Sequence, residues 1–246
     1  MLVKICGAAG VADIEVLAAA GVDFIGLWHG VRGGHAELSA DALGSLAAAA
    51  TLAGPAPVLV TLDSGVAAVR AAVERSGVGW VQLHGYQPPA MVRAMAAEVD
   101  VIKVLHVRGG ECVERGLIRA YERAGVRMFL VDTLAADGRI GSTAVRVDPS
   151  AVAEVLAATT VPVMLAGGLT ADNADQFRSL LTHPRLAGID VDTGARDDTG
   201  RIDPAKVAAI KRGWTAQEFS KIGSNPSVDR NTRSGDAEVV TDEEVP

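Results

Sequence analysis

The chain has 246 residues, of which 49% are hydrophobic and only 4% aromatic, and its net charge is -7. This acidic balance leaves no basic face for a phosphate backbone and argues against nucleic acid as a partner. No segment reaches about 18 apolar residues, the N-terminus lacks a signal-peptide pattern, and the two cysteines show neither metal-ligand nor disulfide spacing, so we expect a soluble cytoplasmic protein without a membrane partner or metal.

The predicted elements alternate between short β-branched runs and longer Ala-rich segments with helical periodicity. In chain order, the predicted strands are residues 2–6, 23–28, 57–62, 79–83, 100–105, 127–132, 161–166 and 187–191. The predicted helices lie at about 11–20, 40–53, 65–76, 88–97, 111–124, 149–158, 171–181 and 204–212. Five residues are suited to an N-cap or a first helical turn: Ser39, Ser64, Asp148, Thr170 and Asp203.

These eight βα repeats predict one α/β domain, a (β/α)8 TIM barrel over residues 1–213. The scarcity of aromatic residues fits a core of Ala, Val, Leu and Ile, as found where helices cover a parallel sheet. An open doubly wound sheet would also alternate, but eight regular repeats in about 215 residues favour the barrel. The apolar period stops at Trp214, so residues 214–246 are predicted to be a polar, disordered tail.

A thiol and a carboxylate stand at the ends of two predicted strands. Active sites of TIM barrels lie at the carboxyl ends of the strands. Cys6 ends the first predicted strand and Asp132 the sixth. General acid–base chemistry needs one group that removes a proton and one that delivers it, and this pair suits those tasks. The alternatives are that Cys6 is a small buried hydrophobic residue and that Asp132 is a helix N-cap or a surface carboxylate.

Glycines follow the seventh and eighth predicted strands, where TIM barrels commonly bind phosphate through backbone N–H groups. Gly167 and Gly168 follow the seventh strand, and Asp192, Thr193 and Gly194 follow the eighth. The alternative is that glycine is needed there only for the geometry of a turn.

Short strings at the strand ends recur across about residues 2–212. In chain order they are Lys4-Ile5-Cys6-Gly7, Gly21-Val22-Asp23-Phe24-Ile25-Gly26, Val81-Gln82-Leu83-His84-Gly85, Val101-Ile102-Lys103, Leu130-Val131-Asp132-Thr133, Leu165-Ala166-Gly167-Gly168-Leu169 and Gly188-Ile189-Asp190-Val191. Any one string could arise by chance, but their ordered co-occurrence resembles the phosphoribosylanthranilate isomerase family, the TIM barrels of the tryptophan pathway.

The resemblance implies an aldose–ketose isomerase, an intramolecular oxidoreductase, that carries out an Amadori rearrangement. An N-(5-phosphoribosyl) arylamine would open at its ring oxygen and become a 1-amino-1-deoxyketose. Asp132 would be the general acid on that oxygen, and Cys6, as a thiolate, would remove the proton from the adjacent sugar carbon. This requires the pKa of Cys6 to fall toward neutrality and Asp132 to stay partly protonated. A monomer or homodimer would bind this small phosphosugar-arylamine without a metal or organic cofactor.

The predicted substrate-binding residues are Arg32, His84, Gly167, Gly168, Asp192, Thr193 and Gly194, of which Arg32 and Asp192 lie where the sequence departs from the family. His84 and Lys103 lie in family strings at strand ends, and a buried structural hydrogen bond or salt bridge is the alternative for each. Asp190 is expected either to support the eighth strand or to touch the ligand.

The second βα loop departs most from the family pattern. The family carries a Ser-Pro-Arg-like string there, whose arginine binds the carboxylate of anthranilate. Here residues 28–39 read Trp-His-Gly-Val-Arg-Gly-Gly-His-Ala-Glu-Leu-Ser. Counting back from Ser39 puts Ala36 where the arginine would fall, and Arg32 reaches the same place only if the Gly-rich loop folds differently. Trp28, His29 and His35 add an aromatic ring and titratable groups to the pocket mouth.

Three other loops also differ from the family. Asp63 stands where the family has asparagine, residues 140–143 replace a Gly-Gly-Ser/Thr-Gly string, and Asp192 replaces the first serine of Ser-Ser-Gly. A carboxylate at Asp192 would repel a neighbouring phosphate by about 1 kcal/mol or more. Phosphate binding then requires that Asp192 turn away or that Arg196 compensate its charge, although an ordinary surface cation is the favoured interpretation of Arg196.

Two other functions stay open at this point. The barrel and its Cys/Asp pair could serve a different, unphosphorylated substrate in specialised metabolism, which the altered second loop and Asp192 favour. The chain could also be a non-catalytic binding barrel, but the retention of both Cys6 and Asp132 argues against that.

Overall fold

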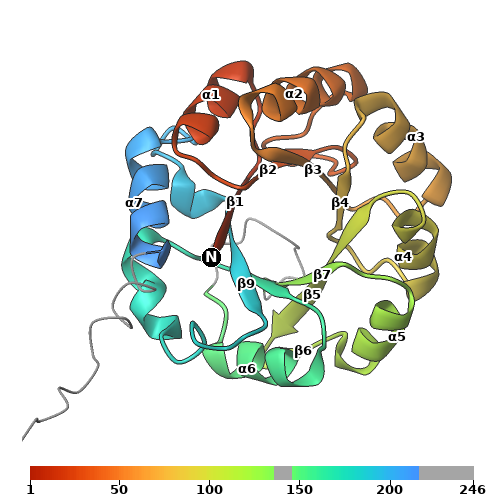
Figure 1. Cartoon of the computed structure of the whole chain (residues 1–246), viewed down its shortest axis with the longest axis vertical. Helices are drawn as coiled ribbons and strands as arrows, with labels where there is room; N and C mark the ends of the chain where they lie inside the picture. Colours follow the sequence, from red (N-terminus) through yellow and green to blue (C-terminus); the bar gives the residue numbers. More distant parts are fainter. Residues whose placement is uncertain (136–145, 216–246) are drawn as a thin grey trace, which may run out of the picture.

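The computed structural model describes residues 1–135 and 146–215. Eight parallel strands form a closed barrel (Figure 1): β1 (Leu2–Cys6), β2 (Phe24–Trp28), β3 (Ala56–Thr61), β4 (Trp80–Leu83), β5 (Asp100–Arg108), β7 (Met128–Thr133), β8 (Val163–Leu165) and β9 (Leu186–Val191). They pair in the order β4-β3-β2-β1-β9-β8-β7-β5, and β4 pairs with β5 to close the ring. The TIM-barrel prediction is confirmed, with all eight strands near their predicted places.

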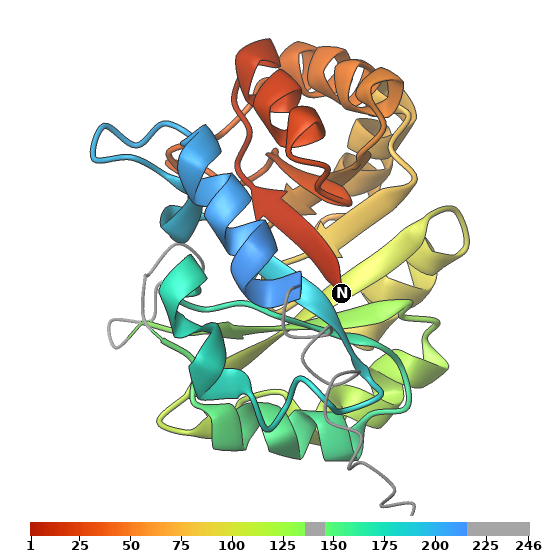
Figure 2. The same ribbon diagram turned by 60° about the vertical axis from the view of Figure 1, so that its left-hand side comes forward.

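Helices surround the barrel on its outer side (Figure 1). They are α1 (Val11–Ala19), α2 (Ala40–Ala53), α3 (Val66–Ser76), α4 (Pro89–Ala96), α5 (Ile118–Arg123), α6 (Pro149–Ala158) and α7 (Pro204–Thr215), with short 3-10 helices η1 (Arg115–Leu117), η2 (Ala171–Phe177) and η3 (Thr193–Ala195). Figure 2 shows α7 lying between η2 and α1, and α7 contacts both, so the last helix joins the end of the ring to its beginning.

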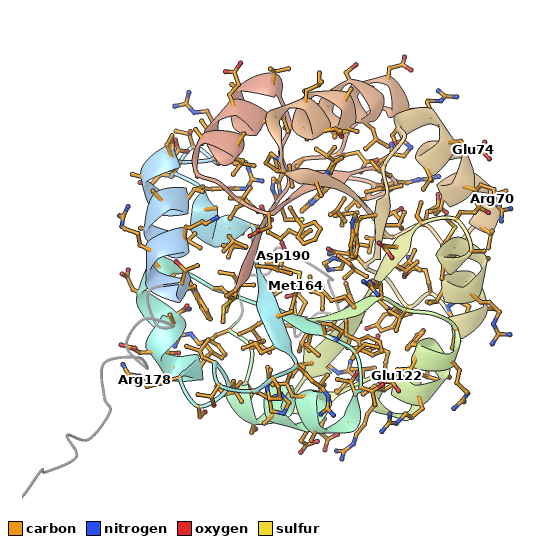
Figure 3. All side chains as sticks on the ribbon, in the orientation of Figure 1. Arg70, Glu74, Glu122, Met164, Arg178 and Asp190 are labelled. Carbon is orange, nitrogen blue, oxygen red and sulfur yellow. The ribbon has the colours of Figure 1, made fainter. Side chains whose placement is uncertain are left out.

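Alternation along the strands divides the buried side chains into two layers. One layer fills the inside of the barrel and includes Cys6, Trp28, Val60, Leu130 and Met164. The other packs the outside of the strands against the helices. In Figure 3, Met164 and Asp190 lie inside the ring of strands, whereas Arg70 and Arg178 lie at its periphery. Polar side chains that share the inner face of the strands, such as Asp190, therefore lie close together inside the barrel.

The segment predicted as one helix over 111–124 is divided. A two-residue strand, β6 (Glu111–Cys112), first pairs antiparallel with the end of β5. Gly109 and Gly110 make this hairpin because both have positive φ, 61° and 82°, which side chains disfavour. Only then do η1 and α5 follow. The predicted helix over 171–181 is likewise the shorter 3-10 helix η2.

Two helix ends differ from the predictions. The N-cap of α3 is Gly65, not Ser64, and the carboxylate of Asp63 accepts the Gly65 N–H at 3.2 Å. At the other end of the chain, α7 continues to Thr215, and the indole of Trp214 is fully buried and donates to Thr170 O at 2.9 Å. The first two residues of the predicted tail are therefore helical, and the rest of that tail lies outside the described residues.

Candidate active site

The thiol of Cys6 sits at the carboxyl end of β1 and receives two hydrogen bonds. Lys4 Nζ donates to Cys6 Sγ at 3.3 Å, and Trp28 Nε1 donates to it at 3.0 Å. Lys4 Nζ also contacts both carboxylate oxygens of Asp190 at 2.9 Å. Gly26 is paired with Cys6 across β1 and β2. Its lack of a side chain makes room for the sulfur, since a Cβ on Gly26 would lie 2.6 Å from Cys6 Sγ.

Burial is the largest influence on the pKa of the Cys6 thiol. Burial raises the pKa of Cys6 to about 12, and the carboxylates of Asp190 and Asp192 add to that, although the Lys4 ammonium and the Trp28 N–H act to lower it. The surroundings of the thiol in the ligand-free site therefore do not by themselves supply the lowered Cys6 pKa that the implied mechanism requires. Burial also raises the pKa of Asp190 above its usual value, although Lys4 opposes this.

Asp132 lies on the inner face of β7 and is 7% exposed. Its Oδ1 accepts the backbone N–H of Thr133 at 2.7 Å, and its Oδ2 lies 3.3 Å from His84 Nε2. The following helix, α6, is capped by Asp148 instead. Asp132 is thus neither a helix N-cap nor a surface carboxylate.

Buried polar groups support His84 from behind. Gln82 Nε2 lies 2.8 Å from His84 Nδ1, and His106 Nε2 lies 3.0 Å from His84 O. His106 Nδ1 is in turn 2.6 Å from Glu114 Oε1, so both ring nitrogens of His106 lie beside oxygen atoms. Burial disfavours the charge of Glu114, but the hydrogen bonds from His106 outweigh burial and lower the pKa of Glu114.

Lys103 points away from the barrel interior. Its Nζ donates to Gly85 O at 2.7 Å and to Val104 O at 2.6 Å, and it lies 5.4 Å from the centre of the Tyr121 ring. Burial lowers the pKa of Lys103 to about 8. Lys103 could have either a ligand-binding or a structural role from its sequence position. This arrangement favours the structural role, because the ammonium connects the end of β4 to β5.

The glycines after β8 and β9 meet at one cavity of about 590 Å³. Gly168, Thr193 and Gly194 line it, together with the side chains of Arg146 and Lys206. Gly167 and Gly168 have positive φ, 88° and 62°, and a Cβ on Gly194 would overlap Leu169 O. Gly167 precedes Gly168 in the chain but does not itself line the cavity. Asp192 does not line it either.

Asp192 faces the side chains of Arg196 and His35. Its Oδ1 accepts a hydrogen bond from Arg196 Nε at 2.7 Å and lies 3.4 Å from His35 Nε2. Arg196 also donates to Cys6 O at 3.2 Å and to Gly7 O at 2.8 Å, and its side chain is only 10% exposed. The interpretation of Arg196 as an ordinary surface cation is wrong, because the guanidinium compensates Asp192 and fastens the loop to β1.

The second loop folds over the indole of Trp28. The rings of Trp28 and His35 pack edge to face with centroids 4.7 Å apart, and Gly34 lies so close that a Cβ would be 2.9 Å from the indole. Ala36 is buried at 2% exposure, whereas Arg32 is exposed on the loop. Within the described residues, the structure does not bring Arg32 to the other predicted site residues. The altered string at 140–143 lies outside the described residues.

The described residues contain no group of three or more His, Cys, Asp or Glu side chains placed to hold a metal ion. In the same part of the chain, none of the helices has the length and apolar character needed to span a bilayer.

Comparison with known proteins identifies the family. A sequence model of N-(5'-phosphoribosyl)anthranilate (PRA) isomerase matches residues 3–212. The N-(5'-phosphoribosyl)anthranilate isomerase of Azorhizobium caulinodans is 32% identical, over 92% of this chain and 95% of that protein. The one from Myxococcus xanthus is 35% identical, over 85% of this chain and 94% of that protein. This chain belongs to the PRA isomerase family.

Solved structures of PRA isomerases share the fold. The enzyme from Thermus thermophilus matches with a TM-score of 0.72 and 23% identity, over 90% of this chain and all of that one. TrpF from Jonesia denitrificans matches with a TM-score of 0.68 and 27% identity, over 89% of this chain and 98% of that one. The resemblance that the strand-end strings indicate is therefore confirmed over almost the whole barrel.

Several polar residues of the candidate site do not stand out in the sequence. The sequence pattern predicts Trp28 only as a ring at the pocket mouth and gives no role to Glu114, Arg146 or Lys206, whereas His106 stands at the end of a predicted strand. Alternation along β5 was a usable signal, since Ile102, Val104 and His106 share one face. The positions of the others depend on loop geometry that a sequence pattern does not contain.

Proposed function

We propose that this chain catalyses the Amadori rearrangement of N-(5-phosphoribosyl)anthranilate in tryptophan biosynthesis, with Cys6 as base and Asp132 as acid. One observation carries the proposal: both groups are on the inner face at the carboxyl end of the barrel, with Asp190 between them. Asp190 binds Lys4, which contacts Cys6, and the charge of Asp132 acts on the pKa of Asp190. A substrate above Asp190 would meet the acid on one side and the base on the other.

Two proton transfers complete the reaction. Asp132 gives its proton to the furanose oxygen while the bond from that oxygen to the anomeric carbon breaks, and the amine nitrogen supplies the electron pair that forms an iminium ion. The Cys6 thiolate then takes the proton from the adjacent sugar carbon, and the electrons of that C–H bond neutralise the iminium to give an enolamine. The enolamine ketonises to the 1-amino-1-deoxyketose.

The raised pKa of Cys6 fits this order of events. In the ligand-free site the thiol is protonated, because burial raises its pKa to about 12. The iminium ion formed in the first step places a positive charge beside the sulfur, and a nearby positive charge favours the thiolate. The iminium charge would thus lower the pKa of the thiol at the stage of the reaction in which the thiolate is needed.

The substrate would lie between two parts of the site. We assign its phosphate to the cavity lined by Gly168, Thr193 and Gly194, where Arg146 and Lys206 supply positive charge. Among the described residues, Gln82 Oε1 is buried without a hydrogen-bond partner, and His84 Nε2 makes no hydrogen bond although Asp132 Oδ2 lies 3.3 Å away, so hydroxyls of an opened sugar would satisfy both atoms. A PRA isomerase of the same fold, 22% identical to this chain, has been solved with reduced 1-(o-carboxyphenylamino)-1-deoxyribulose 5-phosphate.

A second candidate function follows from the second loop. Ala36 is buried where the family places its carboxylate-binding arginine, and Arg32 is exposed. These two observations favour an arylamine without a carboxylate, handled by the same Cys6 and Asp132.

The test is steady-state turnover of phosphoribosylanthranilate, generated in place, beside the corresponding phosphoribosyl adduct of aniline, which lacks the carboxylate. Wild-type protein is compared with Cys6→Ala and Asp132→Asn, and circular dichroism confirms that each variant folds. Turnover of the anthranilate compound that both substitutions abolish supports the proposed function. Preference for the aniline compound supports the second candidate, and turnover of neither by folded wild type contradicts both.

A further inference from the structure

We infer that Trp28 is a further catalytic residue, whose indole N–H stabilises the Cys6 thiolate as it removes the substrate proton. Its nitrogen lies 3.0 Å from Cys6 Sγ, shorter than the 3.3 Å from Lys4 Nζ. The indole N–H is a donor only and cannot take a proton from the sulfur, so its single role toward Cys6 is to donate. This inference rests on the proposed function, since it needs Cys6 to act as the base.

Donation of this kind favours the charged sulfur over the neutral one. A thiol is a weak acceptor, whereas a hydrogen bond to an ionised group is roughly twice as strong as one between neutral groups. Two N–H donors converge on Cys6 Sγ within a site where burial opposes ionisation. The indole therefore helps most when the sulfur is ionised, which is the state that accepts the proton.

The charges around the sulfur leave the thiolate poorly stabilised, so a neutral hydrogen-bond donor adds to its stabilisation. Lys4 is shared with Asp190, so part of its positive charge is already compensated. The carboxylates of Asp190 and Asp192 both disfavour the thiolate. Arg196, the cation that pairs with Asp192, donates to the backbone oxygens of Cys6 and Gly7. Trp28 is the second N–H donor to the sulfur itself and belongs to neither of these ion pairs.

The second loop holds the indole in place. His35 packs against the Trp28 ring and also reaches Asp192, and Gly34 lies against the same ring. The backbone of Trp28 is paired in β2, and its O accepts the N–H of Leu38 from the far side of the loop. The loop that departs from the family pattern thus orients a donor toward the base.

The first measurement compares Trp28→Phe with Trp80→Phe. Phenylalanine keeps a ring in the barrel but removes the N–H, and Trp80, which packs against Phe24, offers the same change away from the sulfur. We expect Trp28→Phe to lower kcat about tenfold to a hundredfold, as loss of a hydrogen bond to a charged group does, with KM nearly unchanged. The deuterium isotope effect for substrate labelled at the carbon that loses the proton should increase, because that step becomes slower.

A second measurement does not depend on activity. The chain has three tryptophans, so a 15N-labelled sample gives three indole N–H signals, and Trp28→Phe identifies that of Trp28. Cys6→Ala should shift this signal and leave that of Trp214 unchanged, since Trp214 donates to Thr170 O. If wild type turns over no anthranilate compound, the proposed function fails while this signal still reports the hydrogen bond.

Three results would overturn the inference. The first is an unmoved Trp28 signal in Cys6→Ala. The second is kcat of Trp28→Phe within twofold of wild type. The third is a lower kcat with an unchanged isotope effect and a loss of thermal stability, matched by Trp80→Phe, which would make the indole a packing residue only.

Discussion

Substitution of Gly26 tests most directly whether the position of Cys6 Sγ matters for the reaction. A Cβ at this position would lie 2.6 Å from Cys6 Sγ and 3.0 Å from Lys4 Nζ, and ordinary contact begins only at 3.4 Å. In Gly26→Ala the sulfur must therefore move by nearly 1 Å, or the two strands must separate. A misplacement of about 1 Å in a catalytic group costs about hundredfold in rate, so we expect kcat to fall by about that factor. Overpacking of the barrel interior should also lower the free energy of unfolding by about 1–3 kcal/mol.

Steady-state kinetics and urea unfolding of Gly26→Ala give both quantities. Gly44→Ala is the matched control, because Gly44 lies inside α2 and its added Cβ would only reach ordinary contact, at 3.6 Å from Arg75 O. That variant should keep wild-type kcat and gain about 0.5–1 kcal/mol of stability, as Ala does over Gly in a helix. A Gly26→Ala enzyme with kcat within twofold of wild type would show that the position of Cys6 Sγ does not limit the reaction.

Two further predictions concern buried charges. Burial lowers the pKa of Lys103 from 10.5 to about 8. Between these two pH values the unfolded chain binds more protons than the folded one, so the free energy of unfolding of wild type should rise with pH, by up to about 3 kcal/mol in total. This rise should be absent in Lys103→Met. The difference between the two urea-unfolding curves against pH isolates this effect, and parallel curves would contradict it. Glu114→Gln removes the charged partner of His106 and should lower the free energy of unfolding by about 3 kcal/mol at neutral pH. Because the Glu114 pKa is lowered from 4.5, wild type loses its advantage as pH falls below that value, and a gap that persists there would show that Glu114 acts otherwise.

The eight strands could be predicted because each is a short apolar run bounded by turn residues, and a buried parallel strand needs little else. The hairpin at Gly109 and Gly110 could not, since the helical period that follows it extends back across residues 111–114. The sequence places Trp214 in the tail because the apolar period stops there. Its burial depends on contact with Phe177, which is distant in sequence.

Cys6 and Asp132 could be located because strand ends alone place them at one edge of the barrel. The partners of Cys6 could not be located in this way. Trp28 reaches the sulfur only because β1 and β2 pair in the register that puts Cys6 opposite Gly26. The pKa of Cys6 depends on burial by the closed barrel, and the position of Arg196 depends on the loop after β9. These are properties of long-range packing that local patterns do not encode.

The departures from the family pattern form one connected group in the structure. Trp28 contacts His35, His35 reaches Asp192, and Asp192 binds Arg196, which holds the backbone of Cys6. Because Arg196 is only 10% exposed, a neutral residue in place of Asp192 would leave a buried cation without its carboxylate, at a cost of several kcal/mol. The backbone oxygens of Cys6, Gly7 and Gly200 would then be the remaining acceptors of the Arg196 guanidinium. Lys4 and Asp190 lie on the strands in strings that match the family, whereas the loop residues of this connected group depart from it.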